Sequence, residues 1–556
     1  MVTQLPTHQR SSALDSGEAM LGGWAPVFGS IRWRCAMRKG IPRAAAVASA
    51  LMILLPLAAA SAGPYVATAV HQASGTPSPP ANGDSPFASC DISGFLIPGE
   101  TNYVNTELEP WVAVNPTNSS NIIGVYQQDR YTFGGARGLA AAVTHDGGAT
   151  WSSTHPPFST CAGGTETNGG DFQRASDPWV TFAPNGDAYF ISLSLTFLGP
   201  PSATGTGVLV SKSTDGGDHW SDPVTLVRDV GDADVAPFFF NDKESITADP
   251  FDSNYVYAVW DRLRKPGGAQ SVNAEHSFAF RGDTLFSRTT DGGLTWEPPR
   301  TIFTRTSLTG TIGNQIAVLP DRTLVDIFDF AQGSGKNAPG FDIQVQRSTD
   351  HGETWSAPIQ VAPERAVRVF DPDTGSSVRA GGGLPDIAVD LNPTSPGYGN
   401  LYAVWGDSFG SEKTKSKPHS TIVFTESTDG GFTWSPLSRI DQSPGDVQAF
   451  TPSVHVASDG TVGVTYYDFR NNTPATGLPT DQWFIHCHPT SDCTDPANWA
   501  ENHVDGPFDL ENAATAGGYF LGDYEGLDSI GTTFTSFFSK TTATDKDNTY
   551  LATISP

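Results

Sequence analysis

The chain has 556 residues, a formal net charge of −27 and a sequence pI near 4.6. Such an acidic surface repels nucleic-acid phosphates and anionic membranes, so neither is expected as a partner. Length alone would allow two or three domains, but a regular repeat along the chain favours a single large one.

The first predicted element is a secretory signal peptide within residues 1–62. Basic residues from Arg32 to Arg43 precede an apolar run from Ala44 to Ala60, and Ala60-Ser61-Ala62 offers a small-residue cleavage site. Residues 37–62 alone make a complete signal peptide, so Met37 is an alternative start. The competing interpretation is an uncleaved membrane anchor, because the apolar run approaches the length of a spanning helix.

The next element, residues 63–89, is rich in Ser, Pro, Gly and Ala and is predicted to be a flexible linker. Residues 90–556 then form the folded domain. Signal cleavage implies a secreted, extracellular protein without membrane insertion, and membrane attachment through the N-terminal segment is the alternative. We expect a monomer.

Within the folded domain, short apolar stretches recur at intervals of 66 to 73 residues. Each is followed by a turn and a second apolar strand, and then by a third and a fourth strand. Seven units of four short strands predict an all-β protein, a β-propeller with seven blades, and six blades plus a hairpin is the alternative. The matching positions are Val112, Val180, Ile246, Ile316, Ile387, Val454 and Leu527.

The last unit runs out after three strands. We expect residues 91–97, near the N-terminus of the domain, to supply the fourth strand. The propeller would then be closed by N- and C-terminal strands, which removes open sheet edges.

Five units carry one short pattern, Ser/Thr-x-Asp-Gly/His-Gly-x-Thr/His-Trp, between the third and fourth strands. The Asp accepts hydrogen bonds from backbone N–H groups of the same turn, a Gly supplies positive φ, and the Trp opens the next strand. We interpret a motif repeated in five units as structural, because the residues of an active site do not follow the symmetry of a repeat. The five carboxylates are Asp146, Asp215, Asp291, Asp350 and Asp429.

Four cysteines remain after signal cleavage, and secretion permits disulfides between them. Of the three possible pairings, we favour Cys487 with Cys493, which would staple the turn where the sixth unit lacks the pattern. Cys90 would then pair with Cys161.

The repeated pattern resembles the Asp-box (BNR repeat) of sialidases and related propellers. This resemblance implies hydrolysis of terminal sialic acids by a Tyr nucleophile with an assisting Glu, an Asp acid/base and three Arg on the substrate carboxylate. Tyr524-Glu525-Gly526-Leu527 fits the family's Tyr position. The chain departs from the family at Phe95-Leu96-Ile97-Pro98, where Leu stands in place of an Arg, and at Asn314-Gln315, where no Glu is present.

We expect ligands to meet the end of the propeller where first strands begin and second strands end. The resemblance implies Tyr524 as nucleophile or polar anchor, Glu244 or Glu525 as its base, and Asp177 as the acid. Substrate anions would be held by residues at the same end, although each arginine could instead pair with an Asp nearby. These residues are Arg130, Arg262, Arg470 and Asp386.

Two functions follow from this reading. The first is a secreted, sialidase-like glycoside hydrolase that acts on an extracellular carbohydrate or glycoconjugate without a cofactor. The second is a non-catalytic extracellular propeller that binds glycan or protein, with Ca²⁺ on its acidic face as an option.

Overall fold

A computed structural model describes residues 65–73, 85–197, 203–230, 239–264, 281–306, 309–332, 340–409 and 418–556. All of them belong to the unit that spans 62–556. The predicted signal peptide and the possible start at Met37 lie outside these residues. Within them the fold is all-β, as predicted, and the helical elements are single 3₁₀ turns at Thr160–Ala162, Pro496–Asn498 and Leu510–Asn512.

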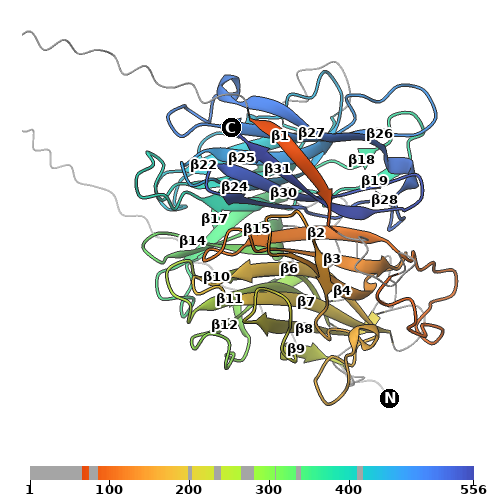
Figure 1. The fold of residues 1–556 in the computed structure, drawn as a ribbon. Helices are drawn as coiled ribbons and strands as arrows, with labels where there is room; N and C mark the ends of the chain where they lie inside the picture. The colour runs from red at the N-terminus through yellow and green to blue at the C-terminus, as the bar shows by residue number, and fades with distance from the viewer. Residues whose placement is uncertain are drawn as a thin grey trace, which may run out of the picture. The chain divides into compact units, whose positions relative to one another are not determined.

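Strands follow one another as consecutive antiparallel groups of four (Figure 1). The first group is β2 Glu107–Val114, β3 Ile122–Arg130, β4 Ala136–Thr144 and β5 Ser152–Thr154. The second is β6 Arg174–Phe182, β7 Ala188–Phe197, β8 Ala203–Ser213 and β9 Val224–Asp229. One residue pair, Ala136 with Ala175, joins these two groups into a single sheet.

Four further groups repeat this order. The third is β10 Phe239–Ala248, β11 Val256–Arg264, β12 Arg281–Thr289 and β13 Arg300–Phe303. The fourth is β14 Thr309–Val318, β15 Leu324–Gln332, β16 Gly340–Ser348 and β17 Ile359–Glu364. The fifth is β20 Asp386–Val389, β21 Leu401–Asp407, β22 Thr421–Ser427 and β23 Ser438–Arg439. The sixth is β24 Ala449–Val456, β25 Val462–Asp468, β26 Pro479–Cys487 and β27 Ala500–Asp509.

The seventh group joins both ends of the described chain. It contains β29 Gly526–Ile530, β30 Thr533–Lys540 and β31 Asn548–Ser555, and β1 Val66–Gln72 pairs antiparallel with β31 (Figure 1). Residues 91–97, expected to supply this strand, form turns instead. The expected role of residues 91–97 is therefore wrong, because a more N-terminal apolar segment pairs with the edge of β31. The same segment, Val66–Gln72, was expected to belong to a flexible linker, and that expectation is also wrong.

The first strands of successive groups are neighbours. β2 contacts β6, and the contacts continue through β10, β14, β20 and β24 to β29, which in turn contacts β2. Successive four-stranded sheets with adjacent first strands have the arrangement of a β-propeller.

A small additional sheet lies outside the repeat. β18 Val369–Phe370 pairs with β19 Ser377–Arg379, and β19 runs parallel to β28 Tyr519–Phe520. This pairing brings Arg379, which precedes the fifth group, beside the segment that leads into β29. The small sheet therefore places the Arg379 guanidinium at a position that the four-stranded repeat by itself does not provide.

Each Asp-box closes its turn with the same four hydrogen bonds. In the first box, Thr144 donates to Asp146 (2.8 Å) and accepts from the Gly148 N–H (3.0 Å). Asp146 accepts from the backbone N–H (2.8 Å) and the hydroxyl (2.6 Å) of Thr150. The same bonds recur in the boxes of Asp215, Asp291, Asp350 and Asp429, except that the His219 imidazole takes the place of the Thr hydroxyl beside Asp215. These carboxylates staple turns, as their repetition predicts.

Both predicted disulfides are present, Cys90–Cys161 and Cys487–Cys493. The second closes the turn between β26 and β27, where the sixth group lacks an Asp-box. The indole N–H of Trp499, in the same turn, donates to the Cys493 carbonyl (2.8 Å).

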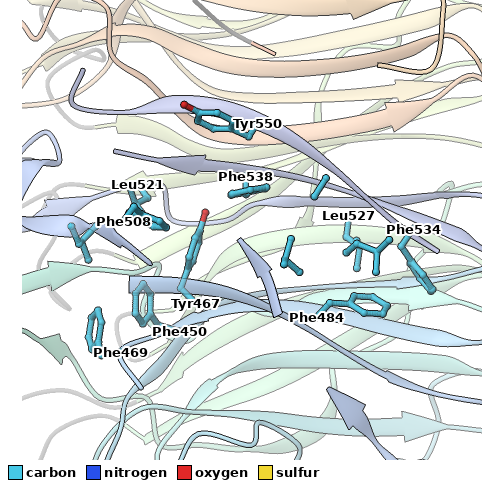
Figure 2. Close-up of a cluster of buried hydrophobic side chains, with 14 of the residues drawn as sticks. Phe450, Tyr467, Phe469, Phe484, Phe508, Leu521, Leu527, Phe534, Phe538 and Tyr550 are labelled. Atoms are coloured by element: carbon cyan, nitrogen blue, oxygen red, sulfur yellow. The ribbon is translucent and has the colours of Figure 1, made fainter. Parts of the chain in front are cut away.

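The apolar core lies between neighbouring sheets. Figure 2 shows its largest cluster, in which the sixth and seventh groups meet. Phe450, Tyr467 and Phe484 come from the sixth group, and Phe534 and Phe538 come from β30. The Tyr467 hydroxyl also donates a hydrogen bond to the Ser539 carbonyl (2.8 Å), so this buried hydroxyl has a partner across the same interface.

Candidate functional site

The first strands share a backbone irregularity at their N-terminal ends. β2, β6, β10, β14 and β24 each shift register by one residue at the same place. The residue that opens each bulge has φ between +50° and +75°, and four of the five are not glycine: Glu109, Asp177, Lys243 and Thr451, with Gly313 in the fifth. Such backbone strain is costly and gathers at functional sites.

A cavity that opens to solvent lies where these bulges converge, and it has about 570 Å³ of empty space when the solvent at its mouth is included. All seven groups, or the loops that lead into them, contribute to its lining. The side chains that carry charge or an aromatic ring are Trp111, Trp179, Lys243, Glu244, Asp386, Asp523, Tyr524 and Glu525.

Three aromatic rings form one wall of the cavity. Trp111 and Trp179 stack with their ring centroids 3.4 Å apart and their planes 22° apart. Tyr524 stands edge-on to both rings, at 6.1 Å from Trp111 and 5.2 Å from Trp179. Such a wall offers the flat apolar surface that covers the C–H face of a sugar ring.

An ion cluster lies beside the aromatic wall. The Lys243 ammonium is 2.7 Å from Asp523, 3.5 Å from Asp177 and 3.7 Å from Glu109. Arg379 binds the Asp523 carboxylate through Nε (2.9 Å) and through a second guanidinium nitrogen. Asp523 is therefore held ionised, and although burial opposes this, the two cations keep its pKa well below the usual range.

Arg379 reaches Asp523 because two loops approach very closely. Gly381 has φ +72°, and a Cβ at this position would lie 2.1 Å from the Asp523 carbonyl oxygen. Only glycine fits such a backbone contact. The small sheet of β18, β19 and β28 holds both loops in this arrangement.

Glu244 is the least satisfied charged group in the cavity. Its side chain is buried, and neither carboxyl oxygen has a hydrogen-bond partner in the described part of the structure. Burial, followed by the negative charge of Asp177, raises the pKa of Glu244 well above its usual value. Both effects favour the protonated, neutral form of Glu244, which would have a proton to donate into the cavity.

Asp177 has the opposite state. Burial raises its pKa, but the Lys243 ammonium and a hydrogen bond from Ser176 (2.6 Å) more than offset this, so its pKa is lowered. Asp177 is not among the residues that line the cavity, but it lies 3.5 Å from the ammonium of Lys243, which does line it. Neighbouring carboxyl groups whose pKa values are driven apart are typical of acid/base sites.

Two other predicted carboxyl groups, Glu525 and Asp386, also line the cavity. Burial raises the pKa of Glu525 to about 8, and its carboxyl accepts a hydrogen bond from Gln482 (2.9 Å). Burial raises the pKa of Asp386 to about 6. Asp386 accepts from the Ser453 hydroxyl and the Val454 N–H, both at 2.8 Å, and so links the fifth group to the sixth.

Tyr524 is in the cavity, but its hydroxyl faces the backbone. It donates to the Pro178 carbonyl oxygen (3.2 Å). Burial and the surrounding carboxylates raise its pKa well above the ordinary value, with Glu109 the largest charge contribution. The Tyr524 hydroxyl is thus bonded to a backbone carbonyl rather than to a general base, unlike the hydroxyl of an activated nucleophile.

The predicted substrate-binding arginines do not line the cavity. Arg262 forms two bonds to Asp229 (2.9 and 2.6 Å), and Arg470 is held by Asp468 (2.6 Å) and Glu501. Arg130 is buried and donates to the Gln127 side chain (2.6 Å). Arg262 and Arg470 pair with nearby carboxylates, which was the stated alternative.

Several residues outside the predicted catalytic and substrate-binding set also build the site. They are Glu109, Trp111, Trp179, Lys243, Arg379 and Asp523. One signal was available, since Glu109-Pro110-Trp111 and Asp177-Pro178-Trp179 repeat the same acidic-Pro-Trp triplet at equivalent strand positions.

Within the residues that the structure describes, no group of three or more His, Cys, Asp or Glu is arranged to hold a metal ion. Over the same residues, no helix is long and apolar enough to cross a membrane.

Comparisons with known proteins agree on the repeat. The family model of the BNR/Asp-box repeat matches residues 346–357, the fourth box, which confirms the predicted repeat. No curated protein matches the chain.

Several solved structures resemble the chain at low identity. A protein of unknown function from Dyadobacter fermentans is 13% identical with a TM-score of 0.42, over 83% of this chain and 100% of that one. A Hadza microbial sialidase is 14% identical with a TM-score of 0.44, over 79% and 74%. An α-L-arabinanase of Penicillium chrysogenum, solved with arabinobiose, is 13% identical with a TM-score of 0.42, over 72% and 94%. These scores are too low to assign a function.

Proposed function

We propose that the seven groups of strands are the blades of one closed propeller and that the protein is a secreted glycoside hydrolase. Its active site is the cavity where the first strands converge. The observation that carries this proposal is Glu244, a buried carboxylic acid with two unpartnered oxygens that faces a cavity walled by tryptophan. A proton donor beside an aromatic platform is what glycosidic bond cleavage requires.

In this mechanism the sugar ring lies against the wall formed by Trp111, Trp179 and Tyr524. Glu244 donates its proton to the glycosidic oxygen as the bond from that oxygen to the anomeric carbon breaks. The ionised Asp523 stabilises the positive charge that develops on the ring. Water then adds to the anomeric carbon, and its proton returns to the Glu244 carboxylate.

Secretion remains part of the proposal, based on the predicted signal peptide at 1–62. Two disulfides support it, since such bonds persist in oxidising compartments. N-terminal sequencing of the exported protein would test it. A chain that begins before Gly63 would favour the membrane anchor instead.

The test of catalysis is hydrolysis of a panel of aryl glycosides by wild type and Glu244→Gln. We expect kcat to fall about 10²- to 10⁴-fold, because the amide has the shape of the acid but cannot donate its proton. The wild-type rate should fall as pH rises through the pKa of Glu244. Glu353→Gln, in an exposed Asp-box turn, is the matched control. Equal rates for Glu244→Gln and wild type would refute the assignment.

Tyr524→Phe separates this mechanism from that of a sialidase. Removal of the hydroxyl costs one hydrogen bond to the Pro178 carbonyl, so we expect less than about a tenfold loss. A loss as large as that of Glu244→Gln would make Tyr524 the nucleophile.

A non-catalytic glycan-binding propeller is the second candidate. It is favoured by Asp523, whose oxygens are occupied by Arg379 and Lys243 and so are not free to act as a base. Under this alternative, wild type binds glycans without cleaving them, and Glu244→Gln binds with similar affinity.

A further inference from the structure

Carboxyl groups predominate among the ionisable side chains that face the cavity. Lys243 is the single basic side chain among the residues that line the cavity, and the structure describes all of these residues. Its ammonium is already within 4 Å of three carboxylates, those of Asp523, Asp177 and Glu109. Four acidic side chains line the same space: Glu244, Asp386, Asp523 and Glu525.

The arginines near the cavity are committed elsewhere. Arg379 directs two guanidinium nitrogens at Asp523, and Arg262 directs two at Asp229. Binding of a substrate carboxylate depends on a guanidinium fork with donors to spare. An anionic sugar entering this cavity would meet no such fork and would instead face carboxyl groups.

The unpartnered polar atoms of the cavity lining are carboxyl oxygens. Both oxygens of Glu244 and one oxygen of Glu525 lack partners among the described residues. A buried polar atom left without a partner costs free energy, which a ligand rich in hydroxyl groups restores, because a hydroxyl can both donate and accept. The stacked pair Trp111 and Trp179 supplies the apolar surface for the ring itself.

We infer that the cavity takes an uncharged, hydroxyl-rich sugar and discriminates against sugars that carry a carboxylate, sialic acid included. This inference rests on the proposed function, because it concerns the same site. It departs from what the Asp-box resemblance implies, since in that family the substrate is defined by its carboxylate.

The test uses pairs of sugars that differ only in charge. Aryl β-glucoside and β-glucuronide share one ring and differ in CH₂OH against COO⁻, and galactoside and galacturonide form a second pair. A sialoside completes the panel. Binding is measured by calorimetry with the full-length protein and with Glu244→Gln, while hydrolysis is recorded separately with wild type.

We expect the neutral member of at least one pair to bind about tenfold or more tightly than its carboxylated partner, because the cavity offers a carboxylate no uncommitted guanidinium and places the ionised Asp523 in its lining. Preference for a uronide or the sialoside would overturn the inference, as would failure of every neutral sugar to bind. If the neutral preference holds but no sugar is cleaved, the hydrolase proposal fails while the ligand class stands.

Gln315→Arg provides a second measurement. Gln315 lines the cavity and donates to the Pro385 carbonyl (3.1 Å), so an arginine here adds an unpaired cation without removing any carboxyl group. We expect the preference for neutral over carboxylated sugar to shrink several-fold, with Gln315→Met as the uncharged control. An unchanged preference in Gln315→Arg would contradict the electrostatic basis of the inference.

Discussion

Gly124→Ala tests whether the last sheet packs against the first. Gly124 lies in β3, and Phe537 reaches it from β30 of the seventh group. A Cβ on Gly124 would lie 2.2, 2.5 and 2.6 Å from three atoms of the Phe537 ring. Ordinary carbon contacts are about 3.5 to 4.0 Å, so the ring would have to move by more than about 1 Å.

The ring has no space for this movement. Phe537 is fully buried and packs among Val112, Tyr126 and Leu551. Overpacking of this kind costs about 1 to 3 kcal/mol, and the gain from replacing glycine within a strand offsets about 0.5 to 1 kcal/mol. We therefore expect the free energy of unfolding to fall by about 1 to 2 kcal/mol.

Urea unfolding at equilibrium measures this change as a lower midpoint with an unchanged slope. Gly340→Ala is the matched control, because Gly340 also lies in a strand but its added Cβ meets nothing closer than 3.7 Å. In a Gly124→Ala background, Phe537→Leu should cost less than it does in wild type, since it relieves the clash. If Gly124→Ala and Gly340→Ala were equally stable, the contact between first and last sheets would be refuted.

Two further predictions concern stability. Burial raises the pKa of Glu525 from 4.5 to about 8, so the folded state holds this proton more tightly than the unfolded state. The contribution of Glu525 to the free energy of unfolding should be complete below pH 4.5 and decline toward pH 8. Glu525→Gln should flatten this decline when urea midpoints are measured against pH. An unchanged pH dependence in Glu525→Gln would exclude Glu525 as its source. Opening the Cys90–Cys161 disulfide, with a sequence separation of 71, should cost about 4 kcal/mol by calorimetry, against about 2 for Cys487–Cys493, with a separation of 6. Equal losses would contradict the loop-entropy argument.

Local chemistry in the sequence was enough to predict the repeat. Each Asp-box is satisfied by residues at most four positions apart, so the eight-residue pattern of Asp146 or Asp350 identifies the turn without any distant partner. The recurrence of apolar strands gave seven groups for the same reason. The disulfide of Cys487 and Cys493 was also accessible, because both cysteines flank one turn.

The choice of the seventh group's outer strand could not be made locally. Both Val66–Gln72 and residues 91–97 are short N-terminal segments with apolar residues, and only the pairing with β31 distinguishes them. An edge strand is selected by a partner almost 500 residues away in the sequence, and no spacing rule encodes that partner.

The sequence by itself determined the all-β repeat, its turn staples and the strand positions from which a site is built, because these depend on contacts within one unit. Tertiary structure decided which of those residues act together. Lys243, Arg379 and Asp523 come from three separate parts of the chain and meet in one ion cluster. Burial and the charge of Asp177 raise the pKa of Glu244, while the Lys243 ammonium helps to lower that of Asp177, the reverse of the states expected for the two groups. Burial and charge depend on distances across the fold, so the proton donor emerges only when the blades are brought together.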